Sequence, residues 1–143
     1  MAKKTLTKEQ IIAAYAVLRA SNNDKLTVTD RLKVSDILRL MRPILQAHKE
    51  DIAEAENTLK PEALTEIEVK VKEESNLTQL DMVRSSIFKH EHDEAKARYE
   101  RQRLAEEHEL DIITFDKACL DKFIEANPGW TPEQLMVVID VLG

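Results

Sequence analysis

The sequence predicts a mainly α-helical protein: a long helical hairpin with a small two-stranded β element and two short C-terminal helices. Glycine occurs only twice in 143 residues and aromatic residues make up 4%, which disfavours sandwiches and barrels. One segment repeats apolar residues at spacings of four and three, and charged residues, at 34%, suit helices with large exposed faces. The length favours a single domain over residues 1–143, with the hairpin core at roughly 7–107 and a small C-terminal lobe at roughly 108–143.

The net charge and the cysteine content narrow the class of protein. A formal charge of −6 disfavours a module that binds nucleic acid directly, because phosphates need a basic face. Acidic residues interrupt the basic cluster of Arg31, Lys33, Arg39 and Arg42, so we interpret it as a solvated helix face. Cys119 stands alone, and no apolar run approaches the ~20 residues that cross a bilayer. Because the first ten residues also lack an apolar segment, we expect no secretion signal, no membrane contact and a cytosolic protein.

Thr7 to Gln10 has the form of a capping box, in which Thr7 caps the first helix and Gln10 reaches back to the Thr7 amide. One face of this helix would be apolar, made of Ile11, Ile12, Tyr15 and Leu18. The short polar side chains of residues 21–25 compete for backbone hydrogen bonds and end the helix.

The strongest pattern is a heptad stripe in the second helix, which we expect to be capped by Thr29 or Asp30 and to end before Pro61. Pro43 lies inside this helix, and we expect a kink there because proline lacks the amide donor. The stripe runs through Val34, Leu38, Met41, Leu45, His48, Ile52, Ala55 and Leu59.

Such a stripe packs lengthwise on another helix, and the rest of the chain need not cover all of it. The candidate partner-interface residues are therefore Val34, Leu38, Met41, Leu45, His48, Ile52, Leu59 and Trp130. His48 is interpreted as a polar seam residue that fixes the helix register, with pH sensing as the alternative. Trp130 follows a turn and is interpreted as covering the end of the core, with a partner contact as the alternative.

The spacing of the apolar residues changes over residues 65–74. Ile67, Val69 and Val71 recur at every second position and alternate with charged residues. This favours a strand, with a helix extension as the alternative. A second short strand is predicted at residues 110–115, and it would pair with residues 66–71 in either direction. Between the two strands, residues 77–107 are predicted as a helix. Its apolar face would begin with Leu80, Val83, Ile87 and Phe88 and continue through Ala95, Tyr99, Gln102 and Ala105.

Two capped helices are predicted for the C-terminal segment. Asp116 would cap the first, which carries Cys119 on its inner face beside Leu120 and Phe123. After the turn at residues 127–129, Thr131 would cap the last helix, with a proline at its first position.

The stretch KHEHDE, residues 89–94, is the densest group of candidate ligands and acid–base residues. On a helix, His90 and His92 lie about 200° apart, so they cannot share one ion. Zinc needs at least three protein ligands, and only His48 or His108 could complete a site through the tertiary fold. We interpret the stretch as a solvated ion-pair face and predict no metal and no cofactor.

No catalytic constellation is evident either. Cys119 has no histidine near it in the sequence, and both glycines lie in the last fifteen residues, which excludes a glycine-rich phosphate loop over the rest of the chain. The sequence therefore predicts a protein that is not an enzyme.

The order of elements resembles that of small helical tailed-phage proteins whose function is unsettled. In that group a short helix with I-x-x-x-Y-x-x-L precedes a turn, an L-x-V entry and a long charged helix. The matching residues here are 11–18 and Leu26-Thr27-Val28. Asp111-Ile112 and Thr131-Pro132-Glu133-Gln134-Leu135 match the D-I segment and the T-P-x-x-L helix that end those proteins. Residues 65–76 and Pro43 depart from the pattern, and the resemblance implies no functional residues.

From the heptad face and this resemblance we expect a non-catalytic, phage-encoded structural or assembly protein. It would form a homo-oligomer, contact other virion proteins, and act in the host cytoplasm or in the virion. The alternative is a small acidic inhibitor or adaptor that binds a host protein through its carboxylate-rich helices.

Overall fold

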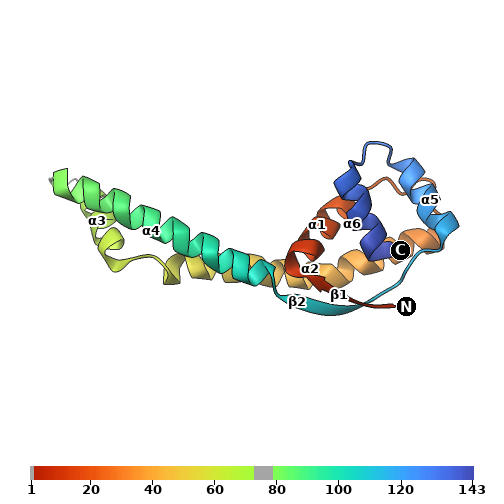
Figure 1. Cartoon of the computed structure of the whole chain (residues 1–143), viewed down its shortest axis with the longest axis horizontal. Coiled ribbons are helices and arrows are strands. Elements are labelled where there is room, and N and C mark those ends of the chain that lie inside the picture. Colours follow the sequence, from red (N-terminus) through yellow and green to blue (C-terminus); the bar gives the residue numbers. More distant parts are fainter. Residues whose placement is uncertain (1, 73–78) are drawn as a thin grey trace. The chain divides into compact units, whose positions relative to one another are not determined.

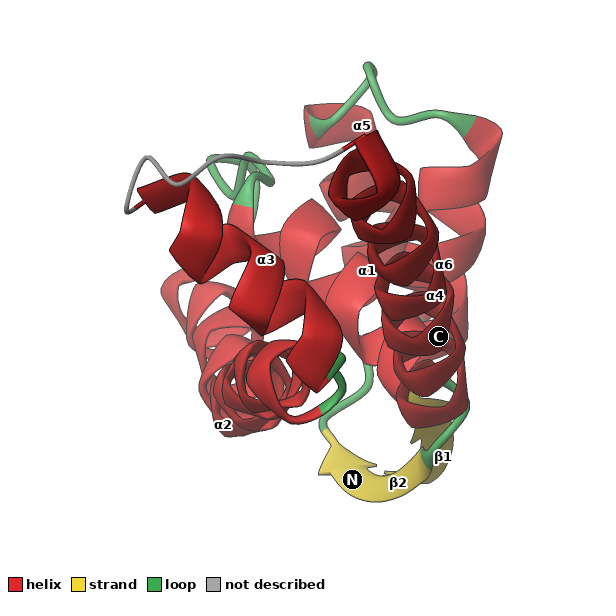
Figure 2. Ribbon diagram, turned by 90° about the vertical axis from the view of Figure 1, so that its left-hand side faces the viewer, coloured by secondary structure: helices red, strands yellow, loops and turns green. Residues whose placement is uncertain are grey.

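The computed structural model describes residues 2–72 and 79–143, and the predicted fold class is confirmed in these residues. Helices dominate the described residues, and the small sheet among them has two strands (Figures 1 and 2). The chain divides into two compact units. Unit 1 joins the N-terminal segment through Ala47 with Leu104–Gly143, and unit 2 is His48–Arg103.

The sheet belongs to unit 1 and pairs the N-terminal segment with a late one. Strand β1 (Ala2–Thr7) runs antiparallel to β2 (Glu107–Ile112), with Ala2 opposite Ile112. The Lys8 amide donates to the Glu106 carbonyl at 2.9 Å and extends the pairing by one step. The predicted strand at residues 110–115 therefore exists but lies at 107–112, and its predicted partner at 66–71 is wrong.

Residues 65–72 are helical, within α3 (Glu62–Lys72) of unit 2, which corrects the predicted strand. Leu64 and Ile67 are buried and lie three residues apart, so the burial follows a helical period rather than the alternation seen in the sequence. Val69 shares that alternation but is exposed. The last residues of the predicted strand, 73 and 74, lie outside the described residues.

Helix α1 (Lys8–Arg19) begins at the predicted capping box, which is confirmed. The Thr7 hydroxyl accepts from the Gln10 amide at 3.2 Å, and the Gln10 side chain accepts from the Thr7 amide at 2.9 Å. Helix α2 (Val28–Thr58) continues through Pro43. Its cap differs from the prediction: the Thr27 hydroxyl accepts from the Asp30 amide at 3.2 Å, so neither Thr29 nor Asp30 is the cap.

The two C-terminal helices are confirmed with their caps. Asp116 caps α5 (Lys117–Ala126), and Thr131 caps α6 (Pro132–Leu142) in a second complete capping box. Both helices pack into the core of unit 1 around Phe123, which is fully buried. The Phe115 and Trp130 rings approach the Phe123 ring with centroid distances of 5.8 and 5.1 Å.

Unit 2 is a helical hairpin made of the last turns of α2, helix α3 and α4 (Gln79–Leu104). The contacts of α2 with α4 run in opposite directions along the two chains: Asp51 meets Tyr99, and Glu56 meets His92. The two helices are therefore antiparallel. The helix predicted over residues 77–107 ends at Leu104, ahead of β2, which begins at Glu107. Residues 77 and 78 of that prediction lie outside the described residues.

Candidate protein-interaction surfaces

The heptad residues of α2 are largely covered within the chain. Val34 and Met41 are buried in the core of unit 1, and Leu38 and Leu45 are half-buried against it. In unit 2, His48 and Ala55 are buried, while Ile52 and Leu59 are half-buried. The side chains that the sequence marks most strongly for a partner are thus already packed by this chain.

Trp130 is half-buried in unit 1, where its ring meets Phe123 edge to face. It also lines a shallow cavity of about 360 Å³. The other lining residues are Ala16, Val17, Ala20, Asn127, Gly129 and Gln134. The Asn127 side chain is engaged with Asn22 and with the Phe123 carbonyl, and Gln134 serves the cap of α6. The polar groups of this cavity are therefore occupied by the fold itself.

Helix α4 turns a mostly polar seam toward the hairpin. The residues that are buried or half-buried along it recur at heptad spacing: Asp81, Ser85, Phe88, His92, Ala95 and Tyr99. Phe88, Ala95 and Tyr99 were predicted on the apolar face, whereas Asp81, Ser85 and His92 were not. Sequence periodicity misses the polar members because it weighs apolar residues only.

Specific partners on α2 stabilise this polar seam. The His92 ring nitrogen Nε2 lies 2.8 Å from the Glu56 carbonyl oxygen. The Tyr99 hydroxyl donates to Asp51 at 2.6 Å, and Arg103 Nε lies 3.3 Å from the same carboxylate. The hydrogen bond to Asp51, helped by burial, raises the pKa of Tyr99, because ionisation would remove the donor and place two negative charges together.

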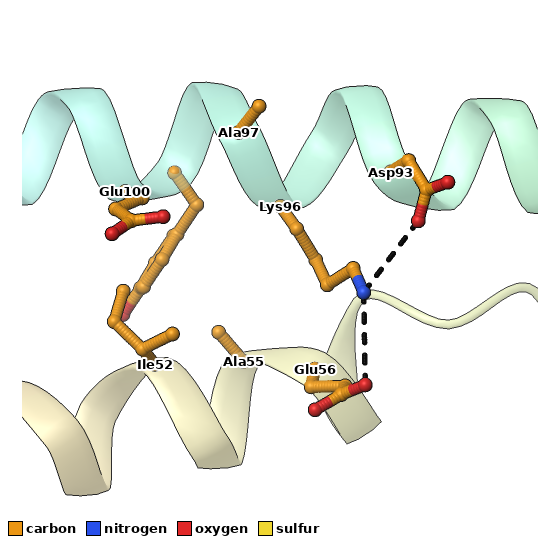
Figure 3. A pocket seen from close by; sticks show the side chains of 8 residues that line it. Ile52, Ala55, Glu56, Asp93, Lys96, Ala97 and Glu100 are labelled. Atoms are coloured by element: carbon orange, nitrogen blue, oxygen red, sulfur yellow. Dashed lines mark ion pairs between the residues drawn. The ribbon is translucent and has the colours of Figure 1, made fainter.

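A cavity of about 310 Å³ opens between α2 and α4 (Figure 3). Small side chains at Ala55 and Ala97 leave the space, and Lys96 crosses its rim to lie 3.6 Å from both Glu56 and Asp93. Glu100 forms no ion pair with a described residue. The lining carries one lysine and the carboxylates of Glu56, Asp93 and Glu100, together with the Tyr99 side chain.

The apolar residues at the start of α4 face away from this seam. Leu80, Val83 and Ile87 are 64%, 52% and 52% exposed, at spacings of three and four that place them on one side. This side lies about 130° around the helix from the seam. We call these three residues the α4 outer stripe. They were predicted to begin the buried face, and the structure corrects that assignment.

Two acidic residues continue the α4 outer stripe toward the C-terminus. Glu91 and Glu94 are exposed and lie four and seven residues after Ile87, so they project from the same side of the helix. Glu94 pairs with His90 at 3.2 Å, whereas Glu91 forms no ion pair with a described residue. This face therefore changes from apolar to acidic along its length.

The first half of α2, in unit 1, also exposes a mixed face. Val28 and Leu32 are 72% and 59% exposed, and Arg39 and Arg42 follow them on the same side of the helix. Neither arginine forms an ion pair with any residue in the described parts of the chain. We call these four residues the α2 outer face. The sequence suggested only a solvated basic face for the segment that contains Leu32 and the two arginines.

His90 and His92 of KHEHDE lie on different sides of α4, as predicted. His90 is exposed, but His92 is buried on the seam, so the predicted solvated face is wrong for His92. Over residues 2–72 and 79–143, no three histidine, cysteine or acidic side chains are placed to hold a metal ion. His48 Nδ1 and His108 Nε2 are buried, and neither has a hydrogen-bond partner among those residues.

Cys119 is buried in the core of unit 1. Burial, helped by a hydrogen bond with Asp30 and by the charge of that carboxylate, raises the pKa of its thiol to about 11. The same hydrogen bond is the main reason that the pKa of Asp30 is lowered. At neutral pH the thiol is therefore protonated, which makes it a poor nucleophile.

No family model, curated protein or solved structure matches this chain. Among the described helices, none is both long enough and apolar enough to cross a membrane.

Proposed function

We propose that this protein is a non-catalytic structural or assembly protein that works through exposed helix faces. The α4 outer stripe is the observation that supports this most. Its three large apolar side chains are exposed to solvent. The inward side of α4 makes polar contacts with α2 through His92 and Tyr99. Covering one such side chain fully contributes about 1.5–3 kcal/mol, so a partner protein would gain most by docking on this stripe.

The inward contacts give the stripe a fixed orientation. His92 and Tyr99 hold α4 by hydrogen bonds to groups on α2, which sets the rotation of α4 about its axis. A helix held in this way presents the same side chains each time, and less ordering is needed when a partner docks. The resemblance to tailed-phage proteins leads us to propose partners in a virion or its precursor, met in the host cytoplasm.

The test is capture of partners from the native cell. The tagged protein, crosslinked during infection, is expected to recover its own copies together with virion proteins identified by mass spectrometry. A variant with Leu80→Ser, Val83→Ser and Ile87→Ser is expected to lose them. Met82→Ser is the matched control, because Met82 is 65% exposed on the same helix but lies about 130° from the stripe.

Two outcomes would contradict the proposal. Equal recovery of partners by the triple variant and the wild type would remove the stripe from the mechanism. Recovery of one host enzyme and no virion protein would replace the assembly role with that of an inhibitor.

A further inference from the structure

We infer that the α4 outer stripe docks on the α2 outer face of a second copy of this chain. The inference rests on the proposed function and names the partner of the same surface. Both surfaces consist of apolar residues followed by charged ones along the helix. The charges are of opposite sign, because arginines belong to the α2 outer face and Glu91 and Glu94 continue the α4 outer stripe. Complementary charges of this kind select the partner and fix the register of two helices.

The spacing of the two faces matches in a parallel arrangement. A constant offset of 52 residues, obtained by subtracting 28 from 80, sets Leu80 beside Val28. The same offset brings Glu91 to Arg39 and Glu94 to Arg42. The matched stretch covers about 21 Å of helix, which is close to four turns. An antiparallel arrangement would instead set the glutamates beside the exposed Val28 and Leu32.

The intervening positions are compatible with this register. Ile87 would meet Ser35, a small exposed residue, and Val83 would meet Arg31, the neighbour of Leu32 in the sequence. Arg84 stands at the flank of the stripe, where its guanidinium lies 5.7 Å from the centre of the Phe88 ring. In a two-fold antiparallel pairing of α4 with itself centred on this stripe, Arg84 would approach its own symmetry mate, and that repulsion disfavours such a pairing.

Free charges on both sides support the inference. Arg39, Arg42 and Glu91 have no ion-pair partner among residues 2–72 and 79–143, so pairing them costs no existing contact. Glu94 would exchange or share its exposed contact with His90. Because the ion pairs would lie at the rim of the contact, they would act mainly on specificity and would weaken with salt.

Charge reversal tests the pairing. Arg39→Glu and Glu91→Arg are each expected to weaken self-association by about fivefold or more, since each sets like charges together. The double variant, and an equimolar mixture of the two single variants, are expected to regain wild-type association. Lys89→Glu is the matched control, because Lys89 is exposed on α4 but lies away from the stripe.

Analytical ultracentrifugation measures the self-association of each variant at low and high salt. The protein concentration would range from about 1 to about 500 µM. Crosslinking of mixed light and isotope-labelled chains that carry Val28→Cys and Leu80→Cys then shows whether the contact joins two copies. A wild-type protein that is monomeric throughout, a double variant that stays weak, or crosslinks within single chains only would each overturn the inference.

Failure of this inference is distinguishable from failure of the proposed function. If self-association is absent but the α4 triple variant still loses virion partners, the stripe serves another protein and the assembly role stands. If the triple variant recovers its own copies and virion proteins as well as the wild type does, both the inference and the proposed function fail.

Discussion

Replacing Tyr99 with phenylalanine removes one hydroxyl and tests the polar seam that holds α4. The hydroxyl donates to Asp51 at 2.6 Å, a distance typical of a hydrogen bond to a charged acceptor. Such bonds contribute about 1.5–3 kcal/mol when buried, and Tyr99 is half-buried, so we expect a loss of about 1–2 kcal/mol in unit 2. Asp51 keeps its contact with Arg103 at 3.3 Å, which limits the loss.

Hydrogen exchange followed by mass spectrometry measures this loss where it occurs. A loss of about 1.4 kcal/mol corresponds to about tenfold faster exchange for amides protected by opening of the hairpin. The exchange rates of peptides from residues 48–58 and 92–103 are expected to rise, while the exchange rates of peptides from β1 and β2 stay the same. Glu100→Gln is the control, because this side chain makes no ion pair or hydrogen bond with a described residue.

The pH dependence of the same variant gives an independent check. The pKa of Tyr99 is raised above its ordinary value of 10.0 in the folded protein. The folded state therefore holds the phenolic proton more tightly than the unfolded state. The resulting stabilisation is present below pH 10 and is lost as the pH rises through the raised pKa. Denaturation by urea should show the difference between wild type and Tyr99→Phe shrinking above pH 10. Unchanged exchange and a difference independent of pH would refute this account of the seam.

Three further predictions concern unit 1. Met41→Ala, at a fully buried side chain, should lower the free energy of unfolding by about 2–5 kcal/mol in urea titrations followed by Trp130 fluorescence. The neighbouring Leu40→Ala should cost far less, because Leu40 is exposed, and equal losses would contradict the burial pattern. Cys119 should react with iodoacetamide at pH 8 at least about a hundredfold more slowly than after unfolding, because a pKa raised from 9.0 to about 11 removes most of the thiolate. Rapid alkylation of the native protein would show that the thiol is exposed. Thr131→Ala should cost about 1 kcal/mol by removing the cap of α6, and a glycine there should cost less, a comparison that thermal melts can make.

Local patterns predicted the helix ends well because a cap depends on residues within one turn of each other. The boxes at Thr7 and Thr131 and the cap at Asp116 needed no knowledge of the fold. The small sheet was harder. The sequence AKKTLT of β1 is short and basic, and only its pairing with β2 more than 100 residues later makes it a strand. Two-stranded sheets are weakly encoded, because they depend on long-range contacts.

Residues 65–72 show how one pattern can fit two structures. Ile67, Val69 and Val71 alternate as in a strand, but Leu64 and Ile67 also satisfy a helical spacing. Packing decided between them, since only the helix buries Leu64 and Ile67 together. The intrinsic preference of the β-branched residues was overridden by tertiary contacts, which sequence periodicity does not contain.

The orientation of α4 was the main surface feature that the sequence could not determine, and its physical reason bears on function. Rotating the helix to bury Leu80, Val83 and Ile87 would gain apolar burial but break the contacts of His92 and Tyr99 with α2. Each polar contact is worth about 1–3 kcal/mol, so a few of them can offset the partial burial of three apolar side chains. A partner that covers the stripe removes this competition, because both faces of α4 are then satisfied at once. In the proposed assembly the polar seam would fix the rotation of the helix, and the exposed stripe would supply the free energy of association.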